Sequence, residues 1–195
     1  MTKFDHFNFL SPIYDHIFGN SSQSTIIELA NIKPHHRVLD AGGGTGRVAA
    51  LVSSLAYETV IVDSAFKMLQ VASKKGIQVS NANAEQLPMI NGIFDRILMV
   101  DALHHVADQQ KTLDELWRLL KPGGLLIVEE PDIRHWLVKL IALGEKLLLM
   151  RSHFLKPSKI KAMCSYIDVE TIEVRTEKGF AWIIISKRKV QNYKE

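Results

Sequence analysis

The clearest chemical pattern in this sequence is an acid followed by alternating glycines. Asp40 precedes Gly42, Gly44 and Gly46, and good helix formers follow over residues 48–52. Glycine lets a backbone turn sharply and approach a ligand without a Cβ in the way, and the helix that follows points free N–H groups at the turn. The pattern predicts a buried strand, a ligand-binding turn and a helix, which make the first half of a nucleotide-binding α/β unit.

Two further polar stretches follow predicted buried strands. Asp63 ends the β-branched run 59–62, and residues 101–106 (Asp-Ala-Leu-His-His-Val) follow the apolar run 94–100. Asp63 comes roughly 20 residues after the first acid, the spacing at which a dinucleotide fold places its ribose-binding acid. Its other interpretation is the N-cap of a helix over residues 65–75. Because the carboxyl ends of parallel strands form the ligand-binding edge of an open sheet, we expect both stretches to border one site.

The glycine spacing distinguishes between two classes of ligand. The dinucleotide fingerprint G-x-G-x-x-G, read from Gly42, needs a glycine where this chain has Arg47. The observed Asp-x-Gly-x-Gly-x-Gly pattern instead resembles the first motif of the class I S-adenosylmethionine (SAM)-dependent methyltransferases. A carboxylate such as Asp40 at the strand end can face the positive amino-acid portion of SAM.

Later segments extend this resemblance. Residues 63–69 resemble the second motif of the family, whose acid holds the ribose, and residues 83–88 resemble its Asp-Ala-x-x-Leu-Pro motif, which reads the adenine edge. The phrase Leu-Lys-Pro-Gly-Gly at 120–124 also matches, as a structural turn. The resemblance implies SAM as cofactor, S-adenosylhomocysteine (SAH) as its product, and a binding site made of Tyr14, Asp40, Gly42, Gly44, Gly46, Asp63, Ser64, Met68, Asn83, Ala84, Glu85, Asp101 and Ala102.

Asn83 departs from the family pattern, because the family has an acid at this position. An amide oxygen still accepts a hydrogen bond from the adenine amino group. The contact loses its charge assistance, on the order of 1 kcal/mol, so we expect retained but weaker SAM binding.

His104 and His105 are the best-placed candidates for a general base. Methyl transfer from a sulfonium requires mainly alignment of the reactants and exclusion of water, and a base helps only where the nucleophile carries a proton. Imidazole has an ordinary pKa near 6.5, which suits that task at neutral pH. The alternative is that both rings cap or pack the loop. The sequence has no metal-ligand cluster, so we expect no metal.

The composition is that of an ordinary globular protein. Of 195 residues, 47% are hydrophobic and 23% charged, and the net charge of +3 does not indicate nucleic-acid binding. The Asn/Asp/Ser-Pro-Pro-aromatic motif of base methylation is also absent after residue 100. The single cysteine, Cys164, and the lack of a signal-peptide pattern favour a cytoplasmic location.

The order of elements predicts an α/β protein with the Rossmann-like class I methyltransferase fold. We expect a mostly parallel seven-stranded sheet with an antiparallel C-terminal hairpin and helices on both faces. One domain would span 1–195, with N-terminal lid helices (1–33), a SAM-binding core (35–130), a helical substrate or packing segment (131–165) and the hairpin (166–187).

Residues 133–152 predict a long helix with an unusually wide apolar face. Packing on the sheet, a tunnel for an apolar substrate, a homodimer face and peripheral contact with a membrane surface all remain open. Lys139, Glu145 and Lys146 interrupt the apolar run, which is shorter than the ~20 residues of a transmembrane helix.

The function that these motifs predict is methyl transfer from SAM to a small-molecule acceptor, apolar or quinone-like. The group that the chain resembles most includes the ubiquinone/menaquinone C-methyltransferases. Two alternatives share parts of the pattern: a non-catalytic SAM- or SAH-binding protein, and an NAD(P)-dependent oxidoreductase. The methylated atom of the acceptor is not predicted.

Overall fold

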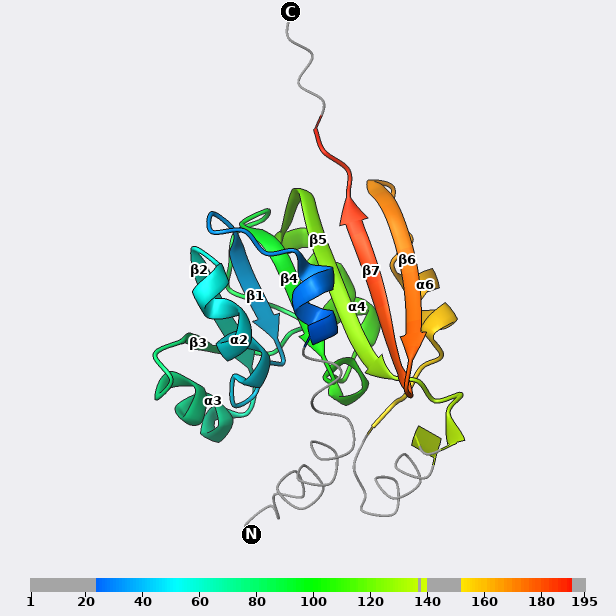
Figure 1. Ribbon diagram of the computed structural model, residues 1–195, viewed down its shortest axis with the longest axis horizontal. Helices are drawn as coiled ribbons and strands as arrows, with labels where there is room; N and C mark the ends of the chain where they lie inside the picture. Colours follow the sequence, from blue (N-terminus) through cyan, green and yellow to red (C-terminus); the bar gives the residue numbers. More distant parts are fainter. Residues whose placement is uncertain (1–23, 137, 140–151, 191–195) are drawn as a thin grey trace, which may run out of the picture.

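A single mixed sheet organises the part of the chain that the computed structural model describes, residues 24–136, 138–139 and 152–190. Its seven strands lie in the order β3-β2-β1-β4-β5-β7-β6 (Figure 1). They are β1 (Arg37–Ala41), β2 (Glu58–Asp63), β3 (Gln78–Asn81), β4 (Phe94–Val100), β5 (Leu120–Pro131), β6 (Val169–Glu177) and β7 (Phe180–Lys187). The first five pair in parallel, and β7 pairs antiparallel with both β5 and β6. The predicted sheet and its C-terminal hairpin are confirmed.

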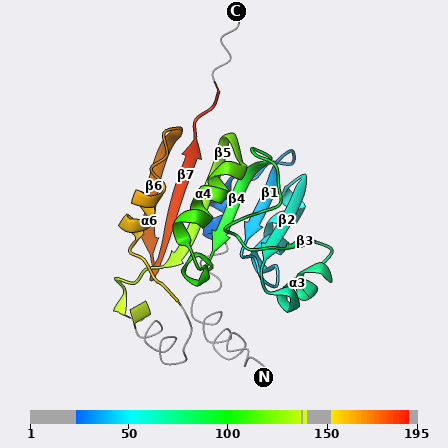
Figure 2. The ribbon, with the colours of Figure 1, turned by 180° about the vertical axis from the view of Figure 1, so that it is seen from behind.

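Helices cover both faces of this sheet (Figures 1 and 2). They are α2 (Arg47–Val52), α3 (Phe66–Ser73), α4 (Gln109–Leu119) and α6 (Pro157–Met163), with short 3₁₀ turns η1 (Ser53–Leu55) and η2 (Leu103–His105). Residues 24–30 are also helical and lie on the same face as α2, whereas α4 and α6 cover the other face.

Strand β4 explains why the sheet is apolar on both sides. Successive side chains of a strand point to opposite faces. Ile97 and Met99 therefore pack in the core under α4, while Leu98 and Val100 pack in the core with residues 24–30 and α2. Burial on both faces produces the continuous apolar run that identified this strand in the sequence.

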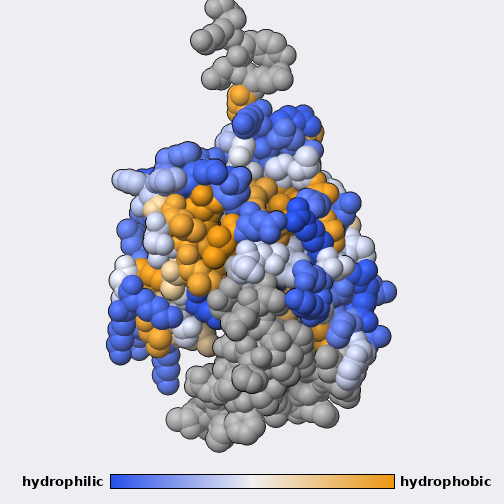
Figure 3. Space-filling model, in the orientation of Figure 1, coloured by the Kyte–Doolittle hydropathy of each residue, from blue (hydrophilic) through white to orange (hydrophobic). Residues whose placement is uncertain are grey.

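The face that carries α2 and residues 24–30 keeps some apolar surface. Leu29, Ile32 and Leu51 pack against the core of that face and are only partly buried. Apolar side chains gather there in the space-filling view (Figure 3).

Some predicted segments fall outside the described residues. Tyr14 does, and so do the rest of the N-terminal lid segment up to residue 23 and most of the long helix expected over 133–152. The helices within the described ranges are all too short or too polar to cross a membrane. Lys121–Gly124, expected as a plain turn, lies within β5, where the register with β4 shifts between the partners of Phe94 and Arg96.

Candidate functional site

The loop between β1 and α2 brings the backbone close to the loop that follows β4. Gly42, Gly44 and Gly46 all have positive φ angles, of 73°, 52° and 77°. A Cβ at Gly42 would lie only 2.6 Å from the Cβ of Ala102. Glycine is therefore required in this turn for two reasons: the backbone has positive φ angles, and at Gly42 two loops of the same sheet edge approach each other closely.

Asp40 lies beneath this loop. Its side chain is 1% exposed, and its Oδ2 accepts a hydrogen bond from the backbone N–H of Ala49 at 3.0 Å. A Cβ at Gly43 would lie 2.6 Å from the Asp40 carboxyl. Burial raises the pKa of Asp40 to about 7, although the Ala49 hydrogen bond lowers it. Within the described structure this carboxyl supports the glycine turn and the start of α2 from below.

Asp63 joins the glycine loop to the turn after β2. Its Oδ2 accepts from the N–H of Gly44 at 2.9 Å, and its Oδ1 accepts from the N–H of Ala65 at 2.7 Å. A Cβ at Gly44 would lie 3.3 Å from the sulfur of Met68. Asp63, Gly44 and Met68 therefore lie together, with Ser64 exposed beside them.

The residues after β3 connect to the turn before α4. Asn83 is exposed and Ala84 is buried. Glu85 Oε1 accepts hydrogen bonds from the N–H groups of Ala107 and Asp108 at 3.0 and 3.4 Å. Glu85 thus links two loops of this sheet edge.

His104 is enclosed by protein atoms. The residue is 2% exposed, and its ring stacks on Phe154 with centroids 4.3 Å apart and places Nδ1 2.7 Å from Glu130 Oε2. The other oxygen of Glu130 accepts from the N–H groups of Ala102 and Leu103 at 3.1 and 2.7 Å. Glu130 therefore fixes the loop after β4 by three hydrogen bonds.

Glu130 was not among the residues that the sequence predicted for the site. Two adjacent acids, Glu129 and Glu130, follow the apolar run 125–128 near the carboxyl end of β5. Their position at the ligand-binding edge was the signal that could have identified them. Glu129 is also buried and accepts from the Trp182 indole N–H at 2.8 Å.

His105 lies half-buried beside His104. Its Nδ1 is 3.3 Å from the hydroxyl of Ser152. Burial, and secondarily the neighbouring His104, lower the pKa of His105 to about 3. The ring is therefore neutral at physiological pH, and its low basicity makes it a weak proton acceptor.

Asp101 is the first residue after β4 and has a left-handed backbone, with φ 54°. Its N–H donates to the Glu129 carbonyl at 2.9 Å, and its side chain is half-buried. Burial raises its pKa to about 7; His104 opposes this shift, and the charges of Glu130 and Glu129 add to it. No hydrogen bond or ion pair to the Asp101 carboxyl occurs among the described residues.

The candidate residues thus divide by location. The glycine loop, Asp63 and Met68 lie together, and Asp101 and Ala102 adjoin that loop. The described ranges hold no group of His, Cys, Asp and Glu side chains arranged for a metal ion.

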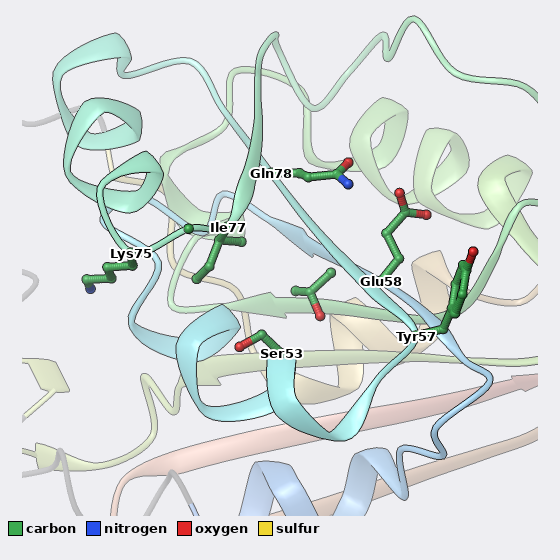
Figure 4. Close-up of a pocket in the computed structure, with 8 residues that line it drawn as sticks. Ser53, Tyr57, Glu58, Lys75, Ile77 and Gln78 are labelled. Carbon is green, nitrogen blue, oxygen red and sulfur yellow. The ribbon is translucent and has the colours of Figure 1, made fainter.

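A separate pocket of about 420 Å³ lies at the opposite, amino ends of β2 and β3 (Figure 4). Polar side chains predominate around it, and the buried hydroxyl of Thr59 has no hydrogen-bond partner among the residues that the structure describes. Its lining residues are Ser53, Tyr57, Glu58, Thr59, Lys75, Gly76, Ile77 and Gln78. None of the predicted site residues lines this pocket.

Comparison with known proteins agrees with the arrangement of the glycine-loop edge. Residues 39–128 match the family model described as a methyltransferase domain. The ubiquinone/menaquinone biosynthesis C-methyltransferase UbiE of Haemophilus ducreyi is 36% identical over 115 residues, which cover 53% of this chain and 44% of that protein. The chain therefore spans less than half the length of this curated relative.

Solved structures match over nearly the whole chain. A SAM-dependent methyltransferase from Thermotoga maritima has a TM-score of 0.75 at 24% identity, with 94% of this chain and 98% of that chain covered. A SAM-dependent methyltransferase from Archaeoglobus fulgidus has a TM-score of 0.74 at 13% identity, with 91% and 99% covered. Sheet order, glycine loop and family match agree: residues 39–128 match the methyltransferase-domain family, and the chain has the fold of the solved SAM-dependent methyltransferases.

Proposed function

We propose that this chain transfers a methyl group from SAM to a small-molecule acceptor and releases SAH. The observation that carries the proposal is the cradle formed by Gly44, Met68 and Asp63. A Cβ at Gly44 would lie 3.3 Å from the Met68 sulfur and 3.8 Å from Asp63 Oδ2, so the missing Cβ leaves room between a carboxylate and an apolar side chain. A ribose and an adenine need these two surfaces side by side.

Asp63 would hold the ribose. Each of its oxygens accepts one backbone N–H and keeps a lone pair for a ribose hydroxyl. Met68 would pack along the adenine, and Asn83 would accept from the adenine amino group. When bound, SAM supplies a methyl group that is already activated by its sulfonium.

Asp40 would act from beneath the loop. Its carboxyl is buried and bonded to Ala49, so we propose that it shapes the glycine turn, whose backbone then meets the amino-acid portion of the cofactor. Glu130 would keep the loop after β4 in place, since three hydrogen bonds fix that loop to the end of β5. In this way the chain orients the reactants and excludes water, which are the main requirements of methyl transfer.

The acceptor that we propose is an apolar, quinone-like ring. The support is the name of the curated relative from Haemophilus ducreyi, a C-methyltransferase of ubiquinone/menaquinone biosynthesis, over the 44% of that protein which this chain covers.

A non-catalytic SAM- or SAH-binding protein is the second candidate. The enclosed ring of His104 and the low basicity of His105 favour it, because neither histidine is well suited to accept a proton. An NAD(P)-dependent oxidoreductase is less favoured, since Arg47 stands where the dinucleotide fingerprint has glycine.

A transfer assay separates these functions. Methyl-labelled SAM is incubated with 1,4-dihydroxynaphthalene and related hydroquinones, and labelled product is measured. We expect labelled product with at least one of these hydroquinones. Tight SAM binding without product from any of them would favour a non-catalytic SAM- or SAH-binding protein.

Substitution of the ribose-binding acid tests the cradle itself. Asp63→Asn should weaken SAH binding by about tenfold to a hundredfold, because charged hydrogen bonds to the ribose are lost. The matched control Asp114→Asn removes an exposed carboxylate on α4 and should bind SAH as the wild type does. Equal affinity of all three proteins for SAH would contradict the assignment of Asp63.

A further inference from the structure

Two of the three proton-accepting groups after β4 are poorly suited to that task. His104 is 2% exposed, with one nitrogen bound to Glu130 and one ring face covered by Phe154. His105 is a weak base in its half-buried position. The third group, Asp101, differs from both, because its carboxyl is partly exposed and has no hydrogen-bond or ion-pair partner among the described residues.

The backbone directs Asp101 to the edge where the glycine loop lies. Its left-handed conformation, φ 54°, turns the chain directly at the end of β4. The next residue, Ala102, touches the glycine loop, since a Cβ at Gly42 would come within 2.6 Å of its side chain. The N–H of Asp101 is fixed by the Glu129 carbonyl, so the position of this residue is set by β5 as well as by β4.

Charged groups from three elements act on the Asp101 carboxyl. They are Arg47 at the start of α2, His104 in η2, and Glu129 and Glu130 in β5. Arg47 and His104 favour the carboxylate, whereas burial and the two glutamates favour the neutral acid. The balance raises the pKa of Asp101 to about 7, so both protonation states are accessible near neutral pH.

We propose that Asp101 faces the reacting methyl group and accepts the proton that the acceptor loses during transfer. This inference rests on the proposed SAM-dependent function and assigns to Asp101 a catalytic part in place of simple cofactor contact. His104 and Glu130 then serve to position the loop that carries it.

The proposed step is balanced in atoms and charge. The acceptor atom X of an X–H group forms a bond to the methyl carbon, and the methyl–sulfur bond breaks with its electron pair left on the sulfur. The proton of X–H passes to an oxygen of the Asp101 carboxylate. The products are X–CH₃, SAH and a neutral Asp101, which returns its proton to water.

The surroundings of Asp101 also select the acceptor class. Glu129 and Glu130 lie within electrostatic range, so an acceptor that arrives as an anion is disfavoured. A neutral hydroquinone fits this step, because it arrives uncharged and offers two kinds of X–H group: its hydroxyl, and the electron-rich ring carbon beside that hydroxyl.

Comparison of SAM with SAH across pH tests this placement. The two ligands share every ionisable group and differ in the methyl and in the sulfonium charge. Asp101 should attract SAM over SAH only when it is ionised. The ratio of the two dissociation constants should therefore shift roughly two hundredfold in favour of SAM as the pH rises through 7, for a charge pair at about 5 Å near a protein surface.

Asp101→Asn should abolish this pH-dependent shift while SAH affinity stays close to that of the wild type. Asparagine also tolerates the left-handed backbone, so the variant should fold, which its thermal unfolding checks. Asp114→Asn is the matched control and should keep the shift. In the methyl-transfer assay with 1,4-dihydroxynaphthalene, Asp101→Asn should lower kcat, and above pH 7 it should also raise the KM for SAM, because the carboxylate that attracts the sulfonium is gone.

The outcomes separate this inference from the proposed function. If the wild type binds neither SAM nor SAH, the proposed function fails. If both bind and Asp101→Asn keeps the same pH-dependent preference for SAM, or the same kcat, the cofactor site stands and the assignment of Asp101 is wrong.

Discussion

At the scale of single residues, buried carboxylates shape the edge of the sheet that carries the candidate site. Asp40, Glu129 and Glu130 are each 3% exposed or less. Each accepts a hydrogen bond from an N–H group on a different segment: α2, β7 and the loop after β4. A buried acid is costly unless such donors satisfy it, so these acids hold segments together.

Glu130 should therefore be important for stability. Glu130→Ala leaves the N–H groups of Ala102 and Leu103 and the ring of His104 without their acceptor in a buried site. We expect the free energy of unfolding to fall by about 2 to 4 kcal/mol, measured by urea denaturation. Glu173→Ala, at an exposed position of β6, should change it by less than about 0.5 kcal/mol. Similar losses in both variants would contradict this account of Glu130.

Asp40 should make stability depend on pH. Burial raises its pKa from 3.8 to about 7, so the native state still holds this proton at a pH where the unfolded chain has released it. The stabilisation that this proton gives the native state is fully present below the pKa of Asp40 in the unfolded chain. It is lost as the pH rises toward 7, by up to ~1.4 kcal/mol per pH unit. Asp40→Asn has no such proton to lose. Its free energy of unfolding relative to the wild type should therefore rise by about 2 kcal/mol between about pH 5 and about pH 8.

Urea denaturation of the two proteins at both pH values gives this difference directly. Asp101, whose pKa is also raised, and His105, whose lowered pKa acts in the opposite direction, are present in both proteins and cancel. Parallel stability curves for wild type and variant would show that Asp40 does not titrate in this range.

At the scale of elements, the glycine loop acts as a spacer between β1 and the loop after β4. Gly42 and Gly76 have nearly the same left-handed φ, 73° and 76°. A Cβ at Gly42 would collide with Ala102, whereas a Cβ at Gly76 would meet nothing within 4 Å. The two positions therefore separate the cost of backbone conformation from the cost of crowding.

Alanine substitution at both positions tests this distinction. Gly76→Ala should cost about 1 to 2 kcal/mol for the left-handed backbone alone. Gly42→Ala should cost a further 1 to 3 kcal/mol, roughly, because Ala102 must move, and should also weaken SAH binding. Thermal unfolding and isothermal titration measure the two effects. Equal costs and unchanged SAH affinity would mean that the close approach of the two loops is unimportant.

The elements of the sheet were predictable from the sequence, and the contacts between their loops were not. The apolar run 94–100 coincides with β4, because burial on both faces leaves a simple pattern. The stacking of Phe154 on His104 joins segments far apart in the chain. No local pattern encodes such a contact, so the sequence did not predict that His104 is enclosed. The burial of Asp40 was not predictable for the same reason.

At the scale of the whole molecule, the strand order places the loops after β1, β2, β4 and β5 at one edge of the sheet. Neighbouring strands in the order β2-β1-β4-β5 bring Asp63, the glycine loop, Asp101 and Glu130 to that edge. The seven-stranded arrangement was predicted through the family resemblance and is confirmed. The acceptor was not predictable in the same way, because the motifs of the sequence describe the cofactor side of the site.

The central claim is that the glycine-loop edge holds a SAM-type ligand and not a dinucleotide. Isothermal titration of the full chain with SAM, SAH and NAD tests it most directly. We predict that SAM and SAH each bind with one site per chain and compete with one another, and that NAD gives no heat of binding. Binding of NAD that SAH fails to displace, or the absence of binding by both SAM and SAH, would contradict the account.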